Sequence, residues 1–221
     1  MSERITATGM VLMSTPVGDY DKRIVLLTRD MGRITCFARG ARRQNSALLA
    51  GTNPFAFGEF EMFVGRDSYT IVKANIKEYF RELTIDPDLA SYGFYFLEIA
   101  NYYTRENLDG SDMLKLIYVS LKALLSEKLD FILVRRIFEL KAMQLNGEYP
   151  VIKDDEPYLE ATKYAFKYVT SSKIERLYTF TVLPDVLEEM GDIIDSFMDK
   201  HIDRKFNSLS LLHLQIEEDN V

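Results

Sequence analysis

Arginine is concentrated in one short stretch of the chain, where its spacing suits a polyanionic ligand. Arg33 and Arg39 lie in a segment that alternates polar and apolar residues, and Arg42 and Arg43 follow in a loop. Phe37 falls on the same predicted face as Arg33 and Arg39. Guanidinium groups along a strand can pair with successive phosphates, and an aromatic ring beside them can stack on a base. These residues predict a surface for single-stranded nucleic acid, and ordinary surface charges on a soluble domain are the alternative.

The distribution of charge along the chain is compatible with either interpretation, although the net charge alone would argue against nucleic acid. The net charge is −7, but residues 1–80 carry eleven Lys/Arg against eight Asp/Glu, a balance of +3. The remainder carries 16 basic and 26 acidic residues, a balance of −10. Only the first part is suited to phosphate, and binding there should weaken steeply with salt. Further basic residues could widen the surface, namely Lys22, Arg23, Arg29, Arg66 and Lys73.

The sequence offers little for catalysis or metal binding. It contains no P-loop, dinucleotide fingerprint, metalloprotease helix motif or nucleophile elbow. Cys36 is the only cysteine, which excludes an internal disulfide and a multi-cysteine zinc site, and its position indicates a small core residue. His201 and His213 are expected to be surface or partly buried residues. The acidic run 154–156 could hold a divalent metal, although such a run is usually a solvated turn.

The arginine-rich stretch lies in a segment whose pattern predicts short strands throughout. Turn signals occur at Asp30–Gly32 and Gly65–Ser68, and one helical turn is expected at Ser46–Gly51. The five predicted strands cover residues 5–13, 23–28, 33–39, 55–64 and 69–79. Five antiparallel strands in about eighty residues, with an insert after the third, suggest an OB-fold β-barrel.

From residue 86 onward the apolar spacing is helical. Asp86-Pro87-Asp88 is a helix-start signal, because proline suits the first turn. The aromatic residues of the first helix fit either a bundle core or a partner-binding groove. Helices are expected at about 87–105, 110–126, 130–146, 157–169, 173–180 and 184–205, and residues 217–221 are expected to form a frayed tail.

The predicted fold class is therefore α+β multidomain. An OB-fold nucleic-acid-binding domain over residues 1–80 precedes an all-α helical domain over residues 81–221. No stretch is long and apolar enough for a membrane span, and the start of the chain lacks the apolar run of a signal peptide. A cytoplasmic location is the expectation from the sequence.

Several short segments resemble, in the same order, the sequences of RecO recombination mediators. The most telling is Gly40-Ala41-Arg42-Arg43 followed by Ser46. Phe138–Pro150 resembles the helix that leads into the zinc module of that family, and Arg204–Leu209 resembles its closing segment. The other matching segments are Gly9–Leu12, Lys22–Thr28, Met31–Ile34, Ala38–Arg43, Ser46–Leu49 and Asn53–Phe55.

The resemblance implies a non-enzymatic DNA repair and homologous recombination protein associated with the nucleoid. Such proteins bind single- and double-stranded DNA, anneal complementary strands and act with the partner RecR. Together they help to load the recombinase RecA onto DNA that is coated by single-stranded-DNA-binding protein. The resemblance implies that the helical domain receives the acidic tail of that coating protein. It places the DNA role on Arg39, Arg42 and Arg43, where the motif matches.

One departure from the family pattern concerns its zinc site. Many relatives carry two Cys-x-x-Cys pairs after the Tyr149-Pro150 step, but here Asp154, Asp155 and Glu156 take the place of the first pair. A tetrahedral cysteine site cannot form, so no cofactor is expected and residues 148–182 replace the zinc module. Two other functions stay open from the sequence. One is a protein-interaction adaptor that does not bind DNA, and the other is a hydrolase with a metal at residues 154–156.

Overall fold

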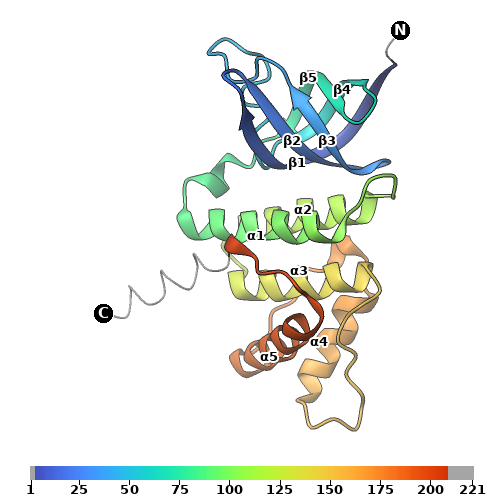
Figure 1. Cartoon of the computed structure of the whole chain (residues 1–221). Coiled ribbons are helices and arrows are strands. Elements are labelled where there is room, and N and C mark those ends of the chain that lie inside the picture. The colour runs from blue at the N-terminus through green and yellow to red at the C-terminus, as the bar shows by residue number, and fades with distance from the viewer. Residues whose placement is uncertain (1–2, 209–221) are drawn as a thin grey trace. The chain divides into compact units, whose positions relative to one another are not determined.

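The computed structural model describes residues 3–208, and Figure 1 shows its strands and helices. His213 and the predicted tail at residues 217–221 lie outside the described residues. The chain divides into two compact units. The first comprises the chain up to Arg81 together with Ala100–Leu114, and the second comprises Glu82–Ile99 and the chain from Lys115 onward. A simple domain boundary at residue 80 stays a prediction.

The first unit contains a five-stranded sheet that closes on itself, drawn in blue to teal in Figure 1. The strand order is β1-β2-β3-β5-β4, and β1 pairs with both β2 and β4. This arrangement confirms the predicted OB-fold. The expectation that all five strands are antiparallel was wrong, because β3 and β5 pair in parallel. The insert and β4 lie between them in the chain, and β4 runs antiparallel to both β1 and β5. The strands are β1 (Arg4–Val17), β2 (Asp21–Thr28), β3 (Gly32–Ala38), β4 (Phe57–Val64) and β5 (Tyr69–Glu78).

Strand β3 has the alternating burial that its sequence predicted. Ile34, Cys36 and Ala38 are buried in the barrel core, whereas Arg33 and Phe37 are half-buried on the other face. Burial of one face of such a strand fixes its register, because a slip of one residue would turn every core side chain toward solvent. The register in turn fixes the point at which the arginine-bearing loop leaves the sheet.

The insert between β3 and β4 differs from the prediction at Ser46–Gly51, which forms hydrogen-bonded turns rather than a helical turn. Single i to i+3 bonds join Leu49 N–H to the Ser46 carbonyl and Asn53 N–H to the Ala50 carbonyl. The Ser46 hydroxyl accepts from Leu48 N–H at 3.2 Å, and such local side-chain bonds compete with helix formation. Leu48 is buried in the barrel core, so the insert is held by packing.

The segment Ala100–Leu114 packs against the start of β3 within the first unit. Gly32 has a φ of +65°, and a Cβ built there would lie 2.1 Å from the Arg105 carbonyl oxygen. Only glycine permits both this backbone conformation and this close approach. Backbone bonds from Arg33 N–H to Arg105 and from Gly110 N–H to Arg29 complete the contact.

The second unit is helical, as predicted. Side-chain oxygens of Asp86, Asp109 and Asp130 accept hydrogen bonds from N–H groups in the first turns of three helices, so these helix starts are confirmed. The helices are α1 (Pro87–Tyr103), α2 (Ser111–Leu124), α3 (Phe131–Leu145), α4 (Glu160–Ser171) and α5 (Pro184–His201).

The helix predicted at 173–180 was wrong. Only a 3₁₀ turn, Ile174–Arg176, forms there. Ile174 and Leu177 are both buried, and their spacing of three suits a 3₁₀ turn as well as an α-helix. The predicted end of the last helix near residue 205 was also too late, because α5 ends at His201, which is exposed as expected.

The aromatic residues of α1 contribute to the core of the helical unit. Tyr95 and Phe96 are fully buried, and the Phe96 ring stacks on Phe138 of α3 with centroids 4.1 Å apart. The apolar stripe of α5 buries Val186 and Met190. Within residues 3–208, no helix is long and apolar enough to cross a membrane.

Candidate nucleic-acid interface

The outer surface of β2 and β3 presents an arginine beside an aromatic ring. Arg23 of β2 and Phe37 of β3 are cross-strand neighbours, and Phe37 also pairs with Thr70 of β5. Arg23 is exposed and Phe37 is half-buried. The β2–β3 face is the face that OB-folds use to bind oligonucleotides. The sequence therefore predicted correctly that Phe37 points away from the core.

The basic loop after β3 is exposed and is tied to the β1–β2 loop. Arg42 N–H donates to the Tyr20 carbonyl at 2.8 Å, and Arg42 Nη1 donates to the Gly18 carbonyl at 3.1 Å. Gly40 N–H donates to Asp21 Oδ1 at 2.7 Å, and the φ of Gly40 is +65°, which favours glycine. Because these bonds connect the two loops, the side chains of Arg42 and Arg43 leave from a fixed backbone.

Tyr20 is a surface residue that the sequence reasoning missed. It lies in the turn between β1 and β2 and is 53% exposed. The guanidinium carbon of Arg43 lies over its ring, 5.1 Å from the centroid. One signal in the sequence could have identified Tyr20. It is a lone aromatic residue in a polar turn, next to a strand that pairs with the arginine segment. We call Arg23, Phe37, Arg39, Arg42, Arg43 and Tyr20 the arginine surface.

Several other cations of the barrel have carboxylate neighbours. Lys77 Nζ lies 2.7 Å from Glu59 Oε1, and this hydrogen bond holds the pKa of Glu59 below its ordinary value. Glu61 pairs with Arg4 and lies 3.7 Å from Lys73 Nζ. Lys73 and Arg29, which the sequence predicted as part of the basic surface, therefore have acidic neighbours. Arg29 Nε lies 3.9 Å from Asp30 Oδ1.

The arginines of the candidate interface lack such partners. Among residues 3–208, no carboxylate oxygen lies within 4.0 Å of the guanidinium nitrogens of these exposed side chains, which are Arg23, Arg39, Arg42, Arg43 and Arg66. Unpaired cations on one face attract phosphate without first breaking an ion pair. Arg66 lies in the β4–β5 turn, three residues before Tyr69, which pairs with Cys36 of β3.

Two residues predicted for the site have their charged ends occupied within the protein. Lys22 is buried, and its ammonium donates to Asn53 Oδ1 at 2.8 Å and to the Leu49 carbonyl and Thr52 hydroxyl at 3.2 Å. Burial, and then the charge of Arg42, lower the pKa of Lys22. It anchors the insert rather than extending the surface.

Arg33 is held in a similar way. Its Nη1 donates to the backbone and side-chain oxygens of Asn101, each at 2.7 Å. This bond joins β3 to the segment Ala100–Leu114 within the first unit. The structure therefore places Arg23 beside Phe37 and Arg43 over Tyr20, and Arg39 and Arg42 are exposed in the stretch that follows β3. Lys22 and Arg33 instead bond to oxygens within the protein.

Cys36 has the environment of a structural thiol. It is fully buried, and its sulfur lies 3.5 Å from the Met62 sulfur. Burial, together with the charge of Glu106, raises the pKa of the Cys36 thiol to about 12. The reactive thiolate is therefore strongly disfavoured at neutral pH.

The acidic run considered for a metal is an exposed turn. Asp154 and Asp155 are exposed, and the Asp154 carbonyl accepts from Lys163 Nζ at 2.7 Å. In the part of the chain that the structure describes, no group of three or more His, Cys, Asp or Glu side chains is placed to hold a metal ion.

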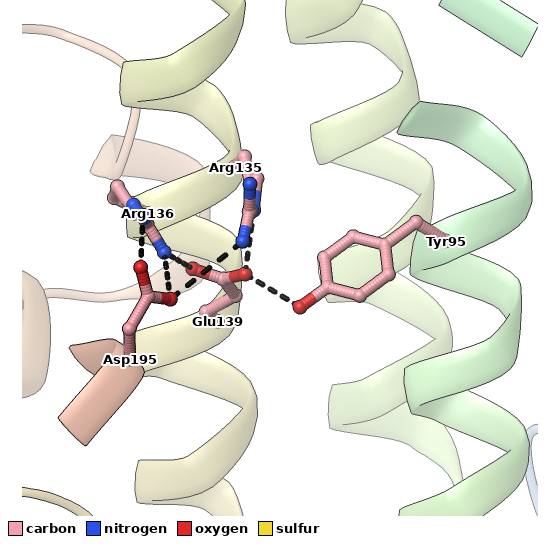
Figure 2. Close-up of polar contacts among 5 residues, drawn as sticks. All are labelled: Tyr95, Arg135, Arg136, Glu139 and Asp195. Carbon is pink, nitrogen blue, oxygen red and sulfur yellow. Dashed lines mark hydrogen bonds and ion pairs between the residues drawn. The ribbon is translucent and has the colours of Figure 1, made fainter. Parts of the chain in front are cut away.

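A buried polar cluster joins α1, α3 and α5 in the helical unit (Figure 2). Glu139 of α3 is 1% exposed and accepts from Tyr95 at 2.5 Å, Arg135 at 2.7 Å and Arg136 at 3.0 Å. Arg136 also makes two bonds to Asp195 of α5, at 2.6 and 2.7 Å. Burial and the Glu139 charge raise the pKa of Tyr95, so its hydroxyl stays protonated and donates.

This cluster fixes helix positions. Glu139 Oε1 accepts from Tyr95 of α1, and both terminal nitrogens of Arg136 donate to Asp195 of α5. Glu139 Oε2 accepts from Arg136 within α3. Gly191 of α5 allows the approach, because a Cβ there would lie 3.0 Å from Arg136 Nη2. Glu139 follows Arg136 by three residues and Arg135 by four, so these ion pairs within one helix could be predicted from the sequence. Nothing local points to Asp195.

Comparisons with known proteins agree with this fold. The family model "Recombination protein O N terminal" matches residues 1–80. A DNA repair protein RecO of Alkaliphilus metalliredigens is 27% identical over 94% of this chain and 98% of its own length. That of Acetivibrio thermocellus is 26% identical over 94% and 96%. That of Caldicellulosiruptor bescii is 34% identical over 65% and 58%. Residues 1–80 thus match the RecO N-terminal family, and nearly the whole chain is similar to DNA repair proteins RecO.

Proposed function

We propose that this DNA repair protein acts as a recombination mediator that binds single- and double-stranded DNA on the arginine surface. The observation that carries the proposal is the contrast in charge pairing on the barrel. Lys73 and Lys77 face carboxylates, whereas Arg39, Arg42 and Arg43 have none within 4.0 Å in residues 3–208. Each phosphate that replaces water at these guanidinium groups releases counterions, which favours binding at low salt.

The same surface supports strand annealing without catalytic chemistry. Two DNA strands repel each other, and cations bound along one strand lower that repulsion when the second strand approaches. Phe37 offers a stacking contact that does not depend on sequence. Arg23 lies beside it on β2, where it can hold the phosphate of the same nucleotide. The proposed role is therefore to hold a strand in place, and no residue is assigned to bond making or breaking.

The proposed partners are RecR, the acidic tail of single-stranded-DNA-binding protein and, indirectly, the recombinase RecA, acting in the nucleoid. For the acidic tail we propose a hollow of about 750 Å³ in the helical unit. Arg204 and Lys205 line it, together with apolar Met198 and Phe206. Its other charged lining residues are Arg135 and Arg136, which pair with Glu139 and Asp195, and the aspartates Asp195, Asp199 and Asp203. We propose that Arg204 and Lys205 receive carboxylates of the tail and that Met198 and Phe206 receive its apolar side chains.

The DNA-binding proposal is tested by titrating the full chain with a labelled oligo-dT at several salt concentrations. We expect binding at low salt, with an affinity that falls steeply as salt increases. Fluorescence anisotropy measures it. If the chain does not bind at low salt, the proposal is wrong.

The protein-interaction adaptor is the competing function. It predicts that RecR is captured equally with and without nuclease and that the pure chain ignores oligonucleotide. Capture of RecR on beads, before and after nuclease treatment, together with the titration above, separates the two functions.

A further inference from the structure

We propose that Tyr20 and Arg43 form a stacking platform that receives an unpaired base, so that the chain distinguishes single-stranded DNA from duplex. This inference rests on the proposed DNA binding and adds a residue that contacts the base. Tyr20 is 53% exposed, and Arg43 lies over its ring at 5.1 Å.

The composite of guanidinium and phenol has the chemistry of a base-binding site. Every base presents a π-face, so an aromatic ring binds single strands with little dependence on sequence. A cation over the ring adds an attractive interaction and brings positive charge to the place where a phosphate follows the base. A paired base in a duplex is already stacked and cannot offer its face, so the platform selects for single strands.

The platform is held in place before any ligand arrives. The Tyr20 carbonyl accepts from Arg42 N–H at 2.8 Å, and the Gly18 carbonyl accepts from the Arg42 side chain. Asp21, next to Tyr20, accepts from Gly40 N–H at 2.7 Å. Because both loops are tied together in the free protein, little conformational entropy is lost when a base stacks.

The position of Tyr20 also matches that of the other aromatic contact. Arg23 pairs with Phe37, and the next pair is Lys22 with Ala38. Tyr20 precedes Lys22 and the arginine loop follows Ala38, so both lie beyond this end of the strand pair. Three residues along a strand correspond to about 10 Å. A single strand that passes along β2 and β3 therefore meets two aromatic rings in succession, each next to an arginine.

The first test compares Tyr20→Ala and Tyr20→Phe with the unchanged full chain. Loss of one stacked base should weaken oligo-dT binding by about 5-fold to 150-fold in Tyr20→Ala, whereas duplex affinity and the salt dependence of binding stay the same. Tyr20→Phe should retain the affinity. Equal affinity of Tyr20→Ala and the unchanged chain for oligo-dT, or an equal loss for duplex, overturns the inference.

A second variant keeps the test independent of any effect on folding. The chain contains no tryptophan, so Tyr20→Trp introduces a single indole, which can be excited selectively beside the tyrosines. Oligo-dT should quench its emission, because the indole stacks on a base. Tyr164→Trp on α4, where the native tyrosine is 70% exposed, should keep its emission. If oligo-dT binds by anisotropy but does not quench Tyr20→Trp, the platform is wrong and the proposed function stands. If neither the unchanged chain nor any variant binds oligo-dT, the stacking platform and the proposed DNA binding are both wrong.

Discussion

Arg43 lies over the ring of Tyr20, with its guanidinium carbon 5.1 Å from the ring centroid. The two residues belong to different loops, which backbone bonds from Arg42 to Tyr20 hold together. This contact places an exposed aromatic ring among arginines that have no carboxylate partner within residues 3–208. The barrel therefore combines charge and stacking on one side, which is the combination that single-stranded DNA requires.

Lys22 and Arg23 are neighbours on β2, but Lys22 anchors the insert whereas Arg23 is proposed to bind DNA. One variant of each residue separates the two roles. Lys22→Met should lower the free energy of unfolding by about 2 kcal/mol, because the oxygens of Leu49 and Asn53 lose a charged donor. Arg23→Met should leave stability nearly unchanged, because the side chain is exposed, and should weaken oligo-dT binding. Urea unfolding and anisotropy measure the two effects. The opposite pattern would show that the two side chains have been assigned to the wrong faces.

The buried Cys36 predicts how the barrel responds to alkaline pH. Its pKa is raised from an ordinary value of 9.0 to about 12, so above pH 9 the unfolded state loses the proton first. The stability that the protonated thiol contributes is present below pH 9 and is lost as pH rises toward 12. Between these values the unchanged chain should lose about 1.4 kcal/mol per pH unit more than Cys36→Ala.

Urea unfolding at pH 9.5 and at pH 11 checks this slope. The comparison with Cys36→Ala removes the contribution of lysines and tyrosines that titrate in the same range. Identical slopes for the two proteins would mean that the thiol is not buried as described.

The cluster around Glu139 should be essential for the stability of the helical unit. Glu139→Gln leaves two buried arginines without their shared carboxylate and should cost about 3 to 5 kcal/mol. The matched control is Glu175→Gln, which breaks the exposed pair with Lys115 and should change stability little. Thermal unfolding of both variants measures the difference. Equal stabilities of the two variants would rule out a structural role for the cluster.

Much of the fold could be predicted from local sequence, because local rules determine it. The alternation at Ile34, Cys36 and Ala38 gave the buried face of β3, and the aspartates before α1 and α3 gave helix starts. The exposure of Arg39, which directly follows buried Ala38, fits the same alternation. These features depend on a few adjacent residues, so they can be predicted from one sequence without an alignment.

The parts that could not be predicted depend on contacts between distant residues. Lys22 is buried because the insert around Thr52 covers it, and β2 has apolar residues on both faces, which hides its alternation. Asp195 reaches Arg136 across 59 residues of sequence. Tyr20 gains its role only when the arginine loop folds over its turn. Each of these cases requires the tertiary structure.

The salt dependence of oligo-dT binding by a charge-deleted chain tests the proposed function most directly. Arg39→Ala, Arg42→Ala and Arg43→Ala combined remove three cations that have no carboxylate within 4.0 Å in residues 3–208. Lys73→Ala with Lys77→Ala removes two cations that already face carboxylates. The triple variant should bind more weakly, and the slope of log affinity against log salt should be smaller by about 2, because each phosphate contact contributes about 0.7. The lysine variant should bind like the unchanged chain. If the triple variant keeps the full affinity and slope, the arginine surface does not hold DNA.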